Sequence, residues 1–174
     1  MQQEMMNSHT SYLNTLQRRF FNRNDLKNTE DYSKHHFGKP KITMKTINVV
    51  AAIILDEGMR ILATERGYGE YEGWWEFPGG KIEPGEGPEM AQRREIMEEL
   101  GVEIEVENLL CTVEHDYPNF HLKMHCYMCS ITKGEIDLRE HKSARWLAKE
   151  SLESVEWLPA DVEVVEKFSI INSI

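Results

Sequence analysis

The fold of this chain is decided by the stretch Gly80-Lys-Ile-Glu-Pro-Gly-Glu-Gly-Pro-Glu-Met-Ala-Gln-Arg-Arg-Glu-Ile-Met-Glu-Glu-Leu-Gly-Val102. Its first part is a glycine-rich loop, and its second part predicts a short helix. Pro88 suits the first position of a helix, where no backbone N–H is needed, and Gly101 suits the residue just past the end. The stretch therefore predicts a loop that runs directly into a helix over residues 88–100.

The predicted helix carries a crowded set of carboxylates. At a helical repeat Glu95, Glu98 and Glu99 project from one face, and Glu86 of the loop adds another acid. Carboxylates packed in this way repel one another and lower helix stability, and a divalent cation would remove that cost. An ordinary solvated acidic face is the alternative interpretation. We expect the other side of the helix to be apolar and to consist of Met90, Ile96, Met97 and Leu100.

The spacing of the whole stretch is more specific than the helix alone. It reads G-x5-E-x7-R-E-[aliphatic]-x-E-E-x-G-[aliphatic]. This pattern resembles the signature of the Nudix hydrolases. The resemblance implies cleavage of a phosphoanhydride bond and a mixed, curled sheet held between helices. The signature positions are filled by Gly80, Glu86, Arg94, Glu95, Ile96, Glu98, Glu99, Gly101 and Val102.

Charge and composition narrow the classes of partner. The chain has 174 residues and a net charge of −10, enough length for one domain with a sizeable core. Residues 1–43 carry 7 Lys or Arg and 4 Asp or Glu, whereas residues 44–174 carry 13 and 26. So acidic a domain is a poor candidate for binding a nucleic acid polymer, and it suits small phosphorylated substrates chelated by metal. No apolar run is long enough to span a membrane.

The chain divides at Met44. Residues 1–43 are polar, without a clear apolar period, and predict a flexible or partly helical N-terminal extension. Either translation begins at Met44, or the extension is an arm that docks on a partner. Three cysteines do not make a disulfide framework, so we expect a reduced, cytoplasmic setting. Cys126 and Cys129 should face opposite sides of a strand, which is poor geometry for a shared metal.

Alternating and apolar runs predict the remaining elements. Residues 46–55 and 59–65 are typical of a β-hairpin, and in the long strand over residues 120–132 one face should be apolar. Strands that alternate with helices predict an α+β fold, an α/β/α sandwich with a mixed sheet. The other predicted strands cover residues 74–77, 103–116 and 143–148, and the other helices cover residues 149–155 and 160–168.

The resemblance implies a role for each polar residue of the signature. Glu98 and Glu99 would bind Mg²⁺ or Mn²⁺ directly, because hard oxygen ligands suit these ions. Glu95 would bind the metal or act as the general base. Arg94 would orient a catalytic carboxylate through charge-assisted hydrogen bonds. Glu86 would belong to the outer shell of the metal.

Two glycines and one distant acid complete the implied site. Gly79 and Gly80 would let the backbone approach the phosphates, and the carbonyl of Gly80 would ligate the metal. A further acid is expected in the loop before the last strand, six residues ahead of its tryptophan. In this chain that acid is Glu140, ahead of Trp146. A solvated loop carboxylate is the alternative interpretation of Glu140.

The sequence around the signature resembles the MutT branch of the family, which converts nucleoside triphosphates to monophosphates and pyrophosphate. The matching stretches are Trp75-Glu-Phe-Pro-Gly-Gly-Lys81 and Leu158-Pro-Ala-Asp161. MutT reads an oxidised guanine with an asparagine where this chain has Asp161. The aspartate resembles instead branch members that act on cytidine nucleotides or oxidised purine triphosphates. An ionised carboxylate accepts hydrogen bonds from either base, and Asp161 has the alternative role of stabilising the start of the last helix.

Four further residues are candidates for contact with the nucleotide. Phe77 and Tyr117 would stack on the base or, equally, pack in the core. Arg66 and Lys81 would bind the phosphates or serve as ordinary surface residues. Each of these alternatives remains open at the level of sequence.

The sequence thus predicts a metal-dependent (deoxy)nucleoside triphosphate pyrophosphohydrolase that cleans the nucleotide pool. Its partner would be a small nucleotide, and the enzyme would be a monomer or a homodimer. One alternative is a Nudix hydrolase of a nucleoside diphosphate derivative such as ADP-ribose. Another is a Nudix module that binds nucleotides without hydrolysis, although such modules typically lose carboxylates that this chain retains.

Overall fold

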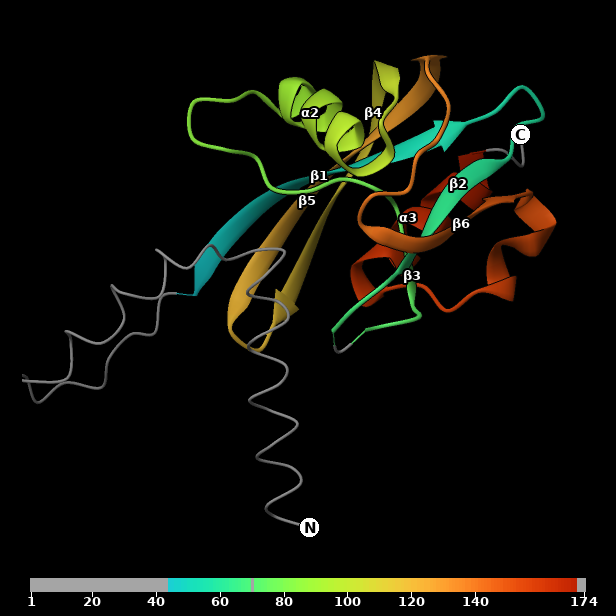
Figure 1. Cartoon of the computed structure of the whole chain (residues 1–174). Coiled ribbons are helices and arrows are strands. Elements are labelled where there is room, and N and C mark those ends of the chain that lie inside the picture. The colour runs from blue at the N-terminus through green and yellow to red at the C-terminus, as the bar shows by residue number, and fades with distance from the viewer. Residues whose placement is uncertain (1–43, 70, 172–174) are drawn as a thin grey trace, which may run out of the picture.

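The computed structural model describes residues 44–69 and 71–171 (Figure 1). The predictions for residues 1–43, namely an extension, its helix and its docking, lie outside the described residues. Within the described residues no helix is long and apolar enough to cross a membrane. The elements in order are β1 (Lys45–Leu55), β2 (Ile61–Arg66), β3 (Trp75–Glu76), α2 (Pro88–Leu100), β4 (Glu103–Tyr117), β5 (Phe120–Lys133), β6 (His141–Leu147), the 3-10 helix η2 (Lys149–Ser154) and α3 (Pro159–Ile171).

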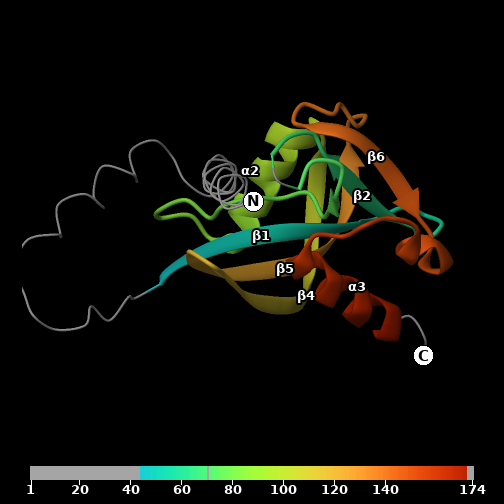
Figure 2. The same cartoon turned by 90° about the horizontal axis from the view of Figure 1, so that it is seen from below.

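The described strands form one mixed sheet between two helices. Its order is β3-β2-β1-β5-β4, and β6 pairs with β2. β1 and β5 run parallel, whereas the other pairs are antiparallel. Figures 1 and 2 show α2 on one side of the sheet and α3 on the other. The predicted α+β sandwich is therefore confirmed.

β1 is buried on both faces, which explains its nearly continuous apolar sequence. Successive side chains of a strand point to opposite faces. Ile53 accordingly packs into a core that includes Phe168 of α3. Its neighbour Ile54 packs into a second core with Ile96 and Leu100 of α2. The central strand thus joins two separate hydrophobic layers.

The predicted β-hairpin is confirmed only next to its turn. β1 and β2 pair at Leu55 and Ile61, and beyond this point β2 pairs with β6. Where β2 no longer pairs with β1, the glycine-rich loop forms hydrogen bonds with that edge of β1. The N–H of Ala52 donates to the carbonyl of Pro78 at 2.8 Å, and the N–H of Val50 donates to the carbonyl of Gly80 at 2.8 Å. This opening of the hairpin brings the loop into the middle of the molecule.

Helix α2 begins and ends where the sequence predicts, but its buried side differs. Pro88 opens it, and Gly101 follows in a left-handed conformation with its N–H bonded to the carbonyl of Met97 at 3.1 Å. Of the residues expected on the apolar side, Ile96 and Leu100 are buried, whereas Met90 and Met97 are 65% and 38% exposed. The helix is turned so that an acid and an amide face inward. The buried residues are Ala91, Gln92, Ile96, Glu99 and Leu100.

The long strand β5 has the faces that its alternation predicts. Leu122, Met124 and Cys126 are buried in the core under α3. Cys129 belongs instead to the core under α2, so the prediction that Cys126 and Cys129 face opposite sides is confirmed. The helix that the sequence predicts over residues 149–155 is the 3-10 helix η2.

Candidate active site

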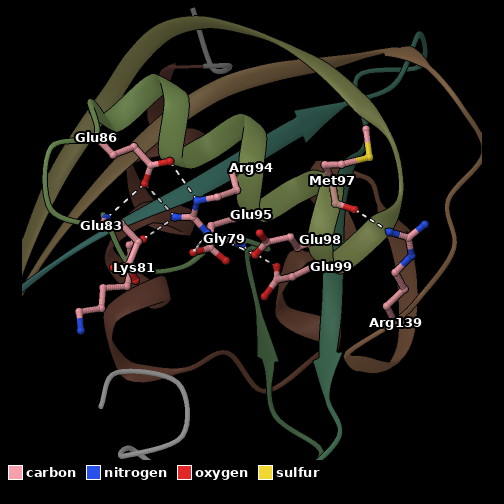
Figure 3. A network of polar contacts seen from close by, with 10 residues as sticks. All are labelled: Gly79, Lys81, Glu83, Glu86, Arg94, Glu95, Met97, Glu98, Glu99 and Arg139. Atoms are coloured by element: carbon pink, nitrogen blue, oxygen red, sulfur yellow. Dashed lines mark hydrogen bonds and ion pairs between the residues drawn. The ribbon is translucent and has the colours of Figure 1, made fainter. Parts of the chain in front are cut away.

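The guanidinium of Arg94 lies at the centre of the carboxylates (Figure 3). Its Nε and Nη2 donate to the two oxygens of Glu86, each at 2.9 Å. Its Nη1 donates to Glu95 at 2.8 Å and reaches Glu98 at 3.3 Å. Nη2 also donates to the carbonyl of Lys81 at 2.9 Å, which ties the helix to the loop. One cation thus holds three acids and one turn of the loop in place.

This arrangement shifts the pKa values of both partners. Hydrogen bonds from Arg94 hold the pKa of the Glu86 carboxyl below its ordinary value. The hydrogen bonds to Glu86, and then those to Glu95, raise the pKa of Arg94 still further above its ordinary range. Both groups are therefore charged at neutral pH, and Arg94 stays available to orient Glu95.

Two consecutive glycines allow the loop to lie directly against the carboxylates. Gly79 has a φ of 150°, and a Cβ there would lie 2.2 Å from the carbonyl oxygen of Val50. Its N–H donates to Oε2 of Glu99 at 2.9 Å. A Cβ on Gly80 would lie 2.5 Å from the carboxyl group of Glu95. Any larger residue would push the carboxylate or the backbone away.

The acids of α2 differ in burial and in hydrogen bonding. Glu99 is buried and is held by Gly79, whereas the side chain of Glu98 is 56% exposed. With Glu95 and Glu98 turned toward Arg94, no three acidic, histidine or cysteine side chains of the described residues converge on one point. The donors themselves fit Mg²⁺ or Mn²⁺, because carboxylate and carbonyl oxygens are the ligands that these ions prefer. The carbonyl of Gly80 already accepts the N–H of Val50, and its second lone pair is the one that a metal would use.

The loop that contains Glu140 is anchored to the end of α2. The preceding residue, Arg139, donates its N–H to the carbonyl of Glu99 at 3.0 Å and its Nη1 to the carbonyl of Met97 at 2.9 Å. A cation at this end of a helix is favourable because the carbonyls there carry partial negative charge. Glu140 is exposed and directly follows this anchor. Sequence reasoning missed Arg139, since its partners lie about forty residues earlier in the chain.

Asp161 and Phe77, both candidates for contact with the base, meet in the structure. The N–H of Phe77 donates to Oδ1 of Asp161 at 3.0 Å, and both residues are buried. Asp161 lies in the first turn of α3, but its carboxylate joins that helix to the segment before the glycines. Phe77 stacks on Trp157 with ring centroids 4.8 Å apart, so its ring is also part of the core.

The remaining candidates occupy different settings. Arg66 is buried, and its Nη1 pairs with Oε2 of Glu76 at 2.8 Å. Tyr117 is buried at the turn between β4 and β5 and stacks on Phe120. The ammonium group of Lys81 points away from the acids of α2 in Figure 3. Their contacts with a nucleotide stay predictions.

Sequence reasoning also missed a buried acid beside Arg66. One carboxylate oxygen of Glu76, in β3, forms the ion pair with Arg66. The other oxygen lies 3.4 Å from Nε2 of His141. The sequence could have indicated this acid, because Glu76 lies within the stretch Trp75–Lys81 that resembles the MutT branch. Its partners were not visible because they come from two other strands.

A comparison with protein families decides the assignment of this fold and this carboxylate helix. The NUDIX domain matches residues 44–168. The chain belongs to the Nudix family. It is therefore an enzyme of the class that hydrolyses phosphoanhydride bonds, and the Nudix signature from Gly80 to Val102 spans the loop before α2 and the whole of that helix.

Individual Nudix proteins of the MutT type are similar over most of their length. The CTP pyrophosphohydrolase of Escherichia coli K12 is 32% identical over 130 residues, which cover 75% of this chain and 96% of that protein. The 8-oxo-dGTP diphosphatase of the same organism is 31% identical over 125 residues, covering 71% and 97%. The crystal structure of a MutT Nudix hydrolase from Burkholderia pseudomallei superimposes with a TM-score of 0.65 at 31% identity and covers 71% of this chain and 98% of that chain.

Proposed function

We propose that this chain is a Mg²⁺-dependent pyrophosphohydrolase of (deoxy)nucleoside triphosphates that releases the monophosphate and pyrophosphate. The observation that carries the proposal is the short segment between Phe77 and Gly80. At one end it bonds to Asp161, the candidate base-reading residue, and at the other it lies against Glu95 and Glu99. Base and phosphate groups would thus be bound at the two ends of one short segment.

The carboxylates of α2 would divide the work of hydrolysis. Glu98, Glu99 and the carbonyl of Gly80 would hold the metal, with Glu95 as a further ligand or as the base that accepts a proton from water. When bound, Mg²⁺ neutralises phosphate charge and acidifies bound water. Arg94 keeps Glu95 oriented through their hydrogen bond of 2.8 Å. Glu86 acts through Arg94, to which it gives two acceptor oxygens.

Asp161 supports a substrate of the cytidine type or an oxidised or otherwise modified nucleotide. A carboxylate can accept several hydrogen bonds, and Phe77 donates one of those that Asp161 accepts. The exocyclic amine of cytosine and the N1–H and N2–H₂ edge of guanine both present donors of the right kind. Relatives named for CTP and for 8-oxo-dGTP match this chain about equally well. We infer a role in cleaning the nucleotide pool of the cytoplasm.

The test is pyrophosphate release with Mg²⁺ from a panel of dCTP, CTP, 5-methyl-dCTP, dGTP and 8-oxo-dGTP, with ADP-ribose included. We expect one class of triphosphate to be hydrolysed with pyrophosphate as product, and chelation of the metal to stop the reaction. Release of AMP from ADP-ribose alone would favour the diphosphate derivative. Binding of a nucleotide without hydrolysis of any compound would favour a non-catalytic module.

Glu98→Gln separates catalysis from folding. We expect the variant to melt like the wild type and to lose more than about 100-fold in kcat, because even outer-shell partners of a metal cost about 10–100-fold. Glu89→Gln is the matched control, an exposed acid of the same helix that pairs only loosely with Arg93 at 3.8 Å. Normal turnover by Glu98→Gln would refute the assignment of the site.

A further inference from the structure

Two cysteines lie directly opposite each other on neighbouring strands. Cys111 of β4 is the partner of Cys126 of β5 in the antiparallel register. Opposed residues in such a pair have Cβ atoms about 4.5–5.5 Å apart, and a disulfide needs about 3.5–4.5 Å. A small local closure of the two strands would thus join them. All three cysteines of the chain carry free thiols.

The two thiols differ in access to solvent. Cys126 is fully buried in the core under α3, which also contains Val164 and Phe168. Cys111 packs against the edge of the same core and is only half-buried. A small oxidant can therefore reach Cys111, while Cys126 is held behind it as a second thiol.

The electrostatic environments of the two thiols also differ, and they favour Cys111 as the thiol that reacts first. The hydrogen bond from the Cys126 thiol, followed by the positive charge of Lys167, lowers the pKa of Cys111. The same bond and burial raise the pKa of Cys126. Lys167 is held on α3 by Glu163 at 2.6 Å. The thiolate is the reactive form, so Cys111 is the more nucleophilic of the two.

We propose that Cys111 and Cys126 are an oxidisable dithiol site that hydroperoxides convert to a reversible cross-strand disulfide. The Cys111 thiolate attacks a peroxide oxygen, the O–O bond breaks, and Cys111 becomes a sulfenic acid while hydroxide leaves. The Cys126 sulfur then attacks the Cys111 sulfur while the Cys126 thiol proton passes to the departing hydroxyl group, so that the S–O bond breaks, an S–S bond forms and water leaves. The two thiols lose two electrons and two protons, and one hydrogen peroxide becomes two waters.

Cys129 provides an internal control. It lies three residues after Cys126 on the same strand but on the opposite face, under α2. Burial raises its pKa to about 12, with a further contribution from Glu107. It has no cysteine partner across the strands, since Val106 of β4 stands opposite. It should therefore remain a thiol under conditions that oxidise the pair.

The experiment treats the full chain with hydrogen peroxide, alkylates the remaining thiols after denaturation and maps peptides without reduction. We expect a peptide in which Cys111 is linked to Cys126, its loss after dithiothreitol, and full alkylation of Cys129. Sulfoxide at the exposed Met90 reports that oxidant was present in sufficient amount. If that sulfoxide forms while Cys111 and Cys126 are both still alkylated, the proposal is overturned, as it is by a linkage that involves Cys129 or a second chain.

Variants assign the two steps. Cys111→Ser should abolish the linked peptide, and Cys129→Ala should form it as the wild type does. Cys126→Ala should stop the reaction at the sulfenic acid, which dimedone traps on Cys111. If Cys126→Ala does not fold, dimedone labelling of the wild type early in the reaction supplies the same information. Labelling of Cys126 in place of Cys111 would contradict the proposed order. None of these readouts depends on hydrolytic activity.

Discussion

The backbone N–H of Phe77 donates a hydrogen bond of 3.0 Å to the carboxylate of Asp161, across 84 residues of sequence. The bond connects the first turn of α3 with the segment that leads into Gly79 and Gly80. A shift of α3 would therefore move the backbone that lies against the acids of α2. Through this bond a residue far from the Nudix signature contacts the segment that leads into it.

Asp161→Asn tests the contact with the base. Because an amide oxygen can still accept the N–H of Phe77, we expect the fold and kcat to change little. The KM for the preferred nucleotide should rise about tenfold or more, since a hydrogen bond to a charged group contributes about 1.5–3 kcal/mol. Steady-state kinetics over the substrate panel measure the change. Glu166→Gln, an exposed acid on the same helix, is the control. Equal KM values for wild type and Asp161→Asn would remove Asp161 from the base site.

The two glycines should fail in different ways when replaced by alanine. At Gly79 the new Cβ meets the Val50 backbone at 2.2 Å, so Gly79→Ala should destabilise the protein by several kcal/mol. At Gly80 it meets the end of the flexible Glu95 side chain. Gly80→Ala should therefore melt close to the wild type but lose activity. Chemical unfolding and kinetics on both variants check this contrast, and a reversed order of stability would contradict it.

The Glu86–Arg94 pair predicts a specific loss of stability in acid. The folded protein keeps Glu86 ionised below its ordinary pKa of 4.5. The pair therefore stabilises the fold fully above that pH, and its contribution is lost as pH falls through the lower folded-state pKa. Urea unfolding from about pH 7 down to about pH 3 should show Glu86→Gln less stable than wild type at neutral pH, with the difference shrinking in acid. A constant gap between Glu86→Gln and wild type would disprove the linkage.

Gln92 predicts a gain of stability on substitution. Its side chain is fully buried, and neither amide atom has a hydrogen-bond partner among the described residues. Burial of an unpaired amide costs about 1–3 kcal/mol, so Gln92→Leu, of nearly the same volume, should raise the free energy of unfolding by about 1 kcal/mol or more. Gln92→Ala is the comparison, because it removes the amide but leaves a cavity. Destabilisation by Gln92→Leu would show that the amide contributes to the fold.

Much of the site was predictable because it is local. Pro88 and Gly101 mark the helix ends, and the repeat of Glu95, Glu98 and Glu99 follows from helix geometry alone. These features depend on residues within one or two turns of each other. Even so, the local pattern did not predict which side of the helix is buried, since that depends on how the helix sits on the sheet.

The sequence by itself thus determined the Nudix signature, the run of strands and the α+β fold class, since each is encoded in short-range spacing and alternation. The tertiary structure alone decided that the loop displaces β2 from the edge of β1, that Arg139 caps α2, and that Asp161 bonds to Phe77. These contacts join segments tens of residues apart, and they exist only once the sheet has formed and the helices have packed on it. The loop and helix from Gly80 to Val102 identify the family. The long-range contacts around them position Phe77 and Asp161, which would select the nucleotide.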